Sequence, residues 1–170
     1  MIKITSSFRE FGDGLVACDP LVDILCKNGL AVSDIRCRVL LDLTPALAYF
    51  IGLTSSLKVG NDTMVIFVGV RSFSSDPLSG GPLLGQTVFV QKECHDVGLG
   101  ATRLEFVETD DGVWVARRFL GAWNGPGWFT EIARPLLNDP PEGQFETPVA
   151  NIGAALQSLI GAMVAKAAES

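Results

Sequence analysis

The chain has 170 residues, of which 48% are hydrophobic and 19% are charged, and its formal net charge at pH 7 is −6. This length predicts a single domain. The basic residues are scattered, so the chain lacks the clustered Lys and Arg that bind phosphates, and we expect no nucleic-acid partner. With so few charged residues, some apolar side chains are expected to remain on the surface. We expect a protein partner to cover this apolar surface, most simply a second copy of the chain in a homodimer.

The first half of the chain mixes strand and helix patterns. Residues 2–8 alternate apolar and polar side chains, as a half-buried strand does. Residues 19–29 open on Asp-Pro and close on Asn-Gly, which predicts a short helix with an Asp N-cap. Residues 34–42 alternate again, and 63–70 are apolar and β-branched, which predicts a central strand covered on both faces. The run at 45–51 fits a brief helix or a strand, and the sequence leaves both open.

The middle of the chain predicts a loop followed by strands. Residues 72–85 are rich in Ser, Gly and Pro, which is typical of a loop. A strand is expected at 87–90. Two further alternating runs within 103–117 flank Asp111-Gly112, and this pair between two such runs predicts a tight hairpin.

The C-terminal part has a helical pattern. A short helix from Trp128 to Arg134 is expected to end or kink at Pro135. Residues 138–146 are typical of a linker-like loop before a terminal helix at 147–168. The large apolar residues of that helix recur at three-four spacing, at Val149, Ile152, Leu156, Leu159 and Met163. Such a seam fits docking on the chain's own sheet or pairing with a second chain, and both stay open.

These elements together predict the fold class. Strands follow one another without alternating helices, which favours an α+β fold over βαβ units. We expect one α+β domain over 1–170. Its mostly antiparallel, curved sheet of five to six strands would pack against a C-terminal helix and a short N-terminal helix.

Targeting signals and cysteine spacing point to the cytoplasm. The N-terminus lacks the apolar core of a secretory signal, and no stretch reaches the ~18 uncharged apolar residues of a membrane span. The four cysteines, Cys18, Cys26, Cys37 and Cys94, have no C-x-x-C spacing. We therefore expect a cytoplasmic protein with reduced structural thiols and no membrane association.

The sequence contains no motif that dictates a chemistry. Cys94-His95-Asp96 invites a catalytic or metal-binding interpretation, but neighbours on a strand point to opposite faces, and no ligand spacing accompanies the single histidine. The glycine-rich stretch at 79–85 lacks the lysine of a phosphate-binding loop. We therefore expect no metal ion and no cofactor. A non-enzymatic role is favoured, and catalysis stays open as the alternative.

Apolar and aromatic residues supply two candidate sites. Three tryptophans lie close together in the sequence and fit a core, a partner surface or a pocket wall. The candidate partner-binding residues are Leu156, Leu159, Met163, Trp123 and Trp128. The candidate pocket between sheet and helix would use Trp114 and Phe89 as walls, beside the polar groups of Cys94 and His95.

The function that this composition favours is non-enzymatic protein binding. The order of helix, strands, Asp-Gly hairpin and closing helix is similar to that of type III secretion chaperones, over residues 20–29 and 103–120. The glycine-rich loop and the helix after Pro141 depart from that pattern, so no family is identified. We expect a binding module of the secretion-chaperone or immunity-protein kind, acting as a homodimer. The alternative is a small-molecule-binding protein or enzyme with an aromatic-lined pocket.

Overall fold

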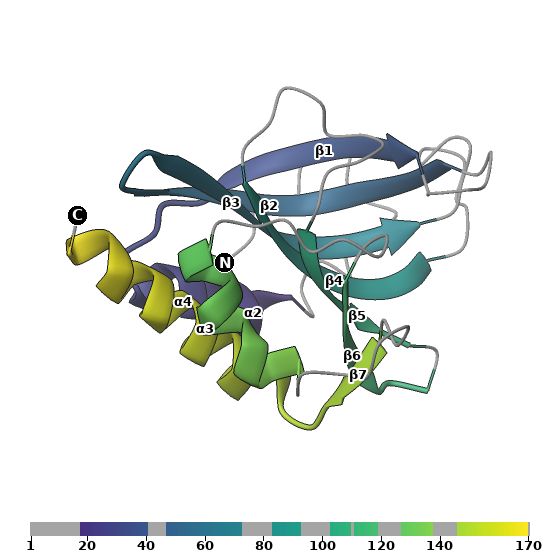
Figure 1. The fold of residues 1–170 in the computed structure, drawn as a ribbon. Helices are drawn as coiled ribbons and strands as arrows, with labels where there is room; N and C mark the ends of the chain where they lie inside the picture. Colours follow the sequence, from purple (N-terminus) through teal and green to yellow (C-terminus); the bar gives the residue numbers. More distant parts are fainter. Residues whose placement is uncertain are drawn as a thin grey trace.

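The computed structural model of the chain describes residues 18–40, 47–72, 83–92, 103–109, 111–118, 127–137 and 146–169. Within these ranges, seven strands form one antiparallel sheet whose spatial order is the chain order (Figure 1). The strands are β1 (Ser33–Leu40), β2 (Leu47–Val59), β3 (Asp62–Ser72), β4 (Leu83–Lys92), β5 (Arg103–Glu108), β6 (Trp114–Arg118) and β7 (Glu146–Val149). The described helices are α2 (Asp19–Lys27), α3 (Gly127–Leu137) and α4 (Ile152–Ala168). The expected α+β class, antiparallel sheet and terminal helix are confirmed, with the short β7 added at one edge.

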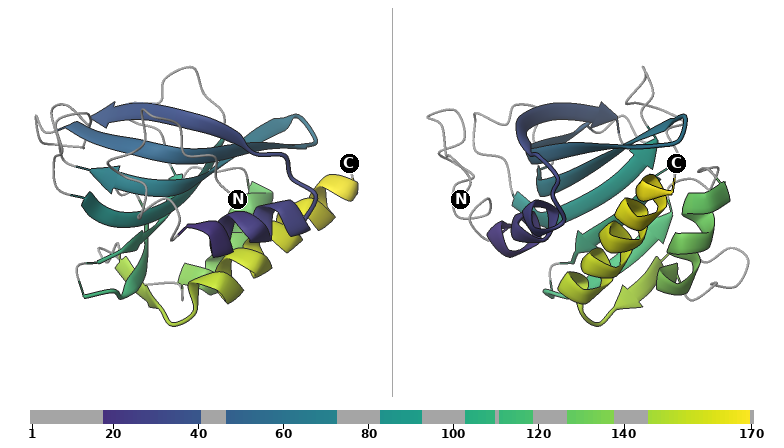
Figure 2. Two further views of the ribbon diagram at one scale, coloured as in Figure 1. Left: turned by 180° about the vertical axis from the view of Figure 1, so that it is seen from behind. Right: turned by 90° about the vertical axis from the view of Figure 1, so that its left-hand side faces the viewer.

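The three helices lie together on one face of the curved sheet, with α4 between α2 and α3 (Figure 2). Their inward residues and alternate residues of the strands form one buried cluster. Its members include Leu21 and Leu25 of α2, Ile66 and Val68 of β3, Phe106 of β5, Phe129 of α3, and Leu156 and Ile160 of α4. Burying this much apolar surface is the main contribution to the stability of such a fold.

The opposite face of the sheet is also apolar. Phe67 of β3 and Phe89 of β4 stand opposite each other in register, and their rings stack with centroids 4.8 Å apart. Both are buried, although neither belongs to the cluster that faces the helices. Because Ile66 and Phe67 are both buried, β3 is covered on both faces, as the run at 63–70 predicts. Two apolar faces account for much of the high hydrophobic content.

Strand pairing resolves the ambiguous run at 45–51. Its described part belongs to β2, which pairs with β1 on one side and β3 on the other. A helix there would leave backbone groups of both neighbours without partners. The turn between β2 and β3 lies at Gly60-Asn61, where Gly60 adopts a positive φ of 60°.

The terminal helix begins later than the expected residue 147. Residues from Glu146 to Val149 form β7 and pair with β6. Pro148 has no backbone N–H to donate, which an edge strand tolerates. The helix α4 then starts at Ile152, where the side chain of Asn151 accepts a hydrogen bond of 3.0 Å from the backbone N–H of Ala154.

Two helix boundaries also differ from expectation, whereas the tight hairpin is confirmed. The N-cap of α2 is Cys18, not Asp19. Pro135 lies inside α3, which continues to Leu137, because a proline in the last turn removes only one late hydrogen bond. The β5–β6 hairpin turns at Gly112, whose φ is 76°. The expected strand at 2–8 and most of the loops at 72–85 and 138–146 lie outside the described residues.

Candidate functional site

The candidate partner-binding residues of α4 lie in the core of their own chain. Leu156 and Met163 are 0% exposed and Leu159 is 1% exposed. All three belong to the cluster between the helices and the sheet. Of the two arrangements that the sequence leaves open, the structure has α4 docked on its own sheet. These side chains are therefore buried within the chain in this arrangement, and their role in binding a partner stays a prediction.

The structure does not bring Phe89 and Trp114 together. Trp114 packs half-buried against the helix-facing cluster, whereas Phe89 stacks on Phe67 on the opposite face. Since successive residues of a strand point to opposite faces, these two cannot line one pocket. Trp123, Cys94 and His95 lie outside the described residues.

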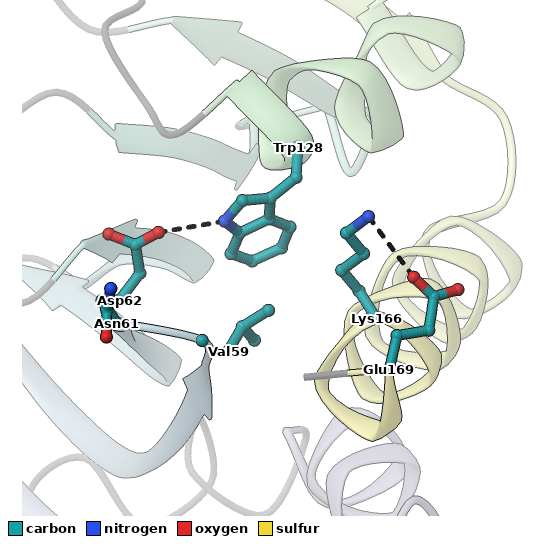
Figure 3. Close-up of a pocket in the computed structure, with 7 residues that line it drawn as sticks. Val59, Asn61, Asp62, Trp128, Lys166 and Glu169 are labelled. Carbon is teal, nitrogen blue, oxygen red and sulfur yellow. Dashed lines mark hydrogen bonds and ion pairs between the residues drawn. The ribbon is translucent and has the colours of Figure 1, made fainter.

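A pocket does form beside Trp128, the remaining candidate. It has a volume of about 300 Å³ and lies where the tip of the β2–β3 hairpin meets the start of α3 and the end of α4 (Figure 3). The residues that line it are Val59, Gly60, Asn61, Asp62, Trp128, Lys166 and Glu169.

Three elements hold these side chains in place. The positive φ of Gly60 closes the hairpin tightly and places Asp62 at the first position of β3. The start of α3 is fixed because Phe129 is fully buried and packs edge-on against Trp128, with ring centroids 5.8 Å apart. The helix α4 is anchored by its buried face and brings Lys166 and Glu169 of its last turn to the pocket.

Asp62 has two side-chain partners at the pocket. The indole Nε1 of Trp128 donates a hydrogen bond of 3.1 Å to its Oδ2, and the Lys92 ammonium lies 3.1 Å from its Oδ1. The hydrogen bond from Trp128, followed by the interaction with Lys92, lowers the pKa of the Asp62 carboxyl below its ordinary value. The indole ring is thereby held in one orientation, and the carboxylate stays ionised.

A second ion pair lies across the pocket. The Nζ atom of Lys166 is 3.4 Å from Oε2 of Glu169 on the same helical turn. Their side chains are 45% and 69% exposed, so solvent screens the pair and its contribution to stability is small, at about 0.3–0.5 kcal/mol for pairs of this kind. The pocket thus combines an indole, two carboxylates, one ammonium and the C-terminal end of a helix, whose carbonyls favour positive charge.

These groups are suited to binding a ligand or a partner side chain. An indole and carboxylates are typical contacts for polar or cationic groups, whereas the lining residues contain no nucleophile beside a base. Sequence reasoning identified Trp128 but missed Asp62, Lys166 and Glu169. Lys166 and Glu169 are one helical turn apart, but nothing in the sequence relates this pair to Asp62, which lies about 100 residues earlier.

The Asp62 interactions predict a specific pH dependence of stability. Because the folded pKa is lowered, the carboxylate contributes stability that is fully present above the unfolded pKa of about 3.9 and is lost as the pH falls through the folded value. We expect Asp62→Asn to cost on the order of 1 kcal/mol near neutral pH, and the deficit to shrink below about pH 4. Urea unfolding across this range measures both effects. Asp23→Asn, at an exposed carboxylate on α2, is the matched control, and a deficit for Asp62→Asn that does not change with pH would contradict the assignment.

Cys18 is buried and Cys26 is exposed. The Sγ atom of Cys18 lies 3.4 Å from the carbonyl oxygen of Gly69, and burial is the main cause that raises the pKa of its thiol to about 12. A thiol in this environment is structural. In the part of the chain that the structure describes, no group of three His, Cys, Asp or Glu residues could hold a metal ion.

Comparisons with known proteins return no relative: no protein-family model, no curated protein and no solved structure matches the chain. None of the helices in the described ranges is both long enough and apolar enough to cross a membrane.

Proposed function

We propose that this chain is a non-enzymatic protein-binding module, of the same general kind as secretion chaperones and immunity proteins, and that the pocket beside Trp128 is its contact site. The observation that supports this proposal is the convergence of one fixed indole and two carboxylates, from three separate elements, around an open pocket. Tryptophan is enriched among the residues that dominate protein–protein binding energies.

The size of the pocket favours a side chain of a protein partner. A volume of about 300 Å³ is at the lower limit for pockets that enclose drug-sized ligands, which span about 300–1,000 Å³. It is large enough for one long side chain. In that arrangement the hairpin tip and the two helices around the pocket would contact the neighbouring surface of the partner.

The described surface supports homodimerisation less strongly than the amino-acid composition does. Among the described residues, Val113 in the β5–β6 turn is the exposed large hydrophobic residue, at 49% exposure. The largest apolar residues of α4 and, among the side chains that the structure describes, Ile66 and Phe67 on the two faces of β3 are buried within the chain. The homodimer therefore stays a prediction, and sedimentation velocity distinguishes a particle of 18.1 kDa from one of twice that mass.

A small-molecule ligand is the second candidate for the same pocket. The observation that favours it is the position of the pocket between a sheet hairpin and two helices, with an indole as one wall. This is the general arrangement that the alternative hypothesis expects, although neither of its proposed walls, Trp114 and Phe89, lines this pocket.

Selection of random dodecapeptides by phage display tests the protein-binding proposal. We expect selected peptides to bind the wild type and to lose at least about tenfold in affinity for Asn61→Tyr, which fills the pocket from an exposed turn. Asp111→Tyr, in the exposed turn of the β5–β6 hairpin, is the matched control and should bind as the wild type does.

Two outcomes would overturn the proposal. The first is a selection that yields no binding peptide, and the second is a set of peptides that bind Asn61→Tyr as tightly as the wild type. A thermal-shift screen of metabolites, run on the same variants, would support the small-molecule alternative if its hits were lost in Asn61→Tyr alone.

A further inference from the structure

The charged and aromatic groups that line the pocket beside Trp128 indicate which kind of partner side chain it binds. We propose that it takes a cationic side chain of a basic partner segment, arginine in preference to lysine, and that Lys166 is an intramolecular competitor for the same position. This inference rests on the proposed protein-binding function. It adds the chemical class of the contact and a residue that regulates its strength.

Negative charge gathers at the pocket from three sources. Asp62 and Glu169 contribute two carboxylates. The helix α4 ends at Ala168, so the partial negative charge of its last carbonyls lies at the same place. The chain as a whole carries a net charge of −6, which attracts basic partners and speeds their encounter.

The indole of Trp128 supplies the contact that favours arginine. Its N–H is donated to Asp62, which fixes the ring, and the half-buried side chain forms part of the pocket wall (Figure 3). A guanidinium is planar and stacks on an aromatic face while it donates hydrogen bonds in its own plane to a carboxylate. An ammonium makes the cation–π contact without the stacking.

Lys166 lines the same pocket and already carries a positive charge there. Figure 3 shows its side chain beside the indole, with Nζ directed to Glu169. The ion pair is exposed on both sides and lies within one helical turn, so a partner can displace it at small cost. Because Lys92 already pairs with Asp62, the two lysines balance the two carboxylates, and removing the Lys166 charge leaves the pocket anionic.

The test uses the dodecapeptides selected on the wild-type protein and versions in which each arginine is replaced by citrulline, its uncharged isostere. We expect the selected peptides to contain arginine more often than lysine, and the citrulline versions to bind at least about tenfold more weakly by calorimetric titration. We expect Lys166→Met, which keeps the length of the side chain, to bind the basic peptides about threefold to tenfold more tightly. Lys27→Met, at an exposed lysine on α2, is the matched control and should not change the affinity.

The failure of this inference is distinguishable from the failure of the proposed function. Selected peptides without basic residues, citrulline versions that bind equally well, or a Lys166→Met variant that binds no more tightly than Lys27→Met would each overturn the inference. In all three cases the peptides would still bind at a site sensitive to Asn61→Tyr, so protein binding would stand. Loss of that sensitivity would instead remove the proposed function.

Discussion

Replacing Leu156 and Leu159 together by serine is expected to unfold the protein. Leu156 is 0% and Leu159 1% exposed, and both pack between α4 and the sheet. Truncating a buried leucine costs about 2–5 kcal/mol, and domains of this size are stable by only about 5–15 kcal/mol. Two such losses, with a hydroxyl buried at each site, approach or exceed the whole free energy of unfolding.

Circular dichroism and urea titration measure this effect. The matched control is Ala165→Ser, which places the same hydroxyl on an exposed position of α4 and should change the free energy of unfolding by no more than about 0.5 kcal/mol. A double variant that stays folded but sediments at half the mass of the wild type would show that the helix pairs across two chains, contrary to the structure.

Gly52→Ala is expected to have the next largest effect, a destabilisation of at least about 1–3 kcal/mol. Gly52 stands opposite Gly69 in the β2–β3 pairing. A Cβ atom at Gly52 would overlap the carbonyl oxygen of Val68 and lie 2.5 Å from the Cα of Gly69. These are backbone atoms in the middle of the sheet, so neither can move aside without disturbing the strand pairing.

Gly127→Ala is the control for this substitution. A Cβ atom there meets no atom within 4 Å, and Gly127 has no positive φ. We expect its free energy of unfolding to stay within about 0.5 kcal/mol of the wild-type value. Equal urea midpoints for Gly52→Ala and the wild type would show that the two strands do not approach each other as closely as the structure has them.

Much of the fold follows from local patterns in the sequence. Asp111-Gly112 identifies its hairpin because only a few residue types adopt the positive φ that such a turn needs. The central strand is recognisable at 63–70 because both of its faces are buried, which removes polar residues from the run. In both cases, the sequence pattern and the element that it predicts lie within the same few residues.

The parts that could not be predicted depend on pairing over long distances. Val149 continues the helical spacing of α4, yet it pairs with Trp114 across the edge of the sheet, and no local pattern reveals that partner. The run that became β2 likewise fits either structure until its neighbours on both sides are known. Tertiary context overrides local propensity at both places.

The candidate site was only partly predictable for the same reason. Trp128 and Asp62 lie far apart in the chain, and only the meeting of the hairpin with α3 joins them. The sequence also does not reveal that the sheet buries apolar residues on both faces, with Phe67 on one face and Ile66 on the other. Much of the high hydrophobic content therefore forms the interior, and the apolar partner surface stays a prediction.

Chemical-shift mapping of the isotopically labelled protein with the selected peptides is the most direct measurement of where this protein binds. If the pocket is the contact site, the peptides should shift the amide signals of Gly60, Asn61 and Glu169 and the indole signal of Trp128, and leave the α2 amides unchanged. Shifts centred on α2 or on the β5–β6 turn, with these four signals unmoved, would contradict that assignment.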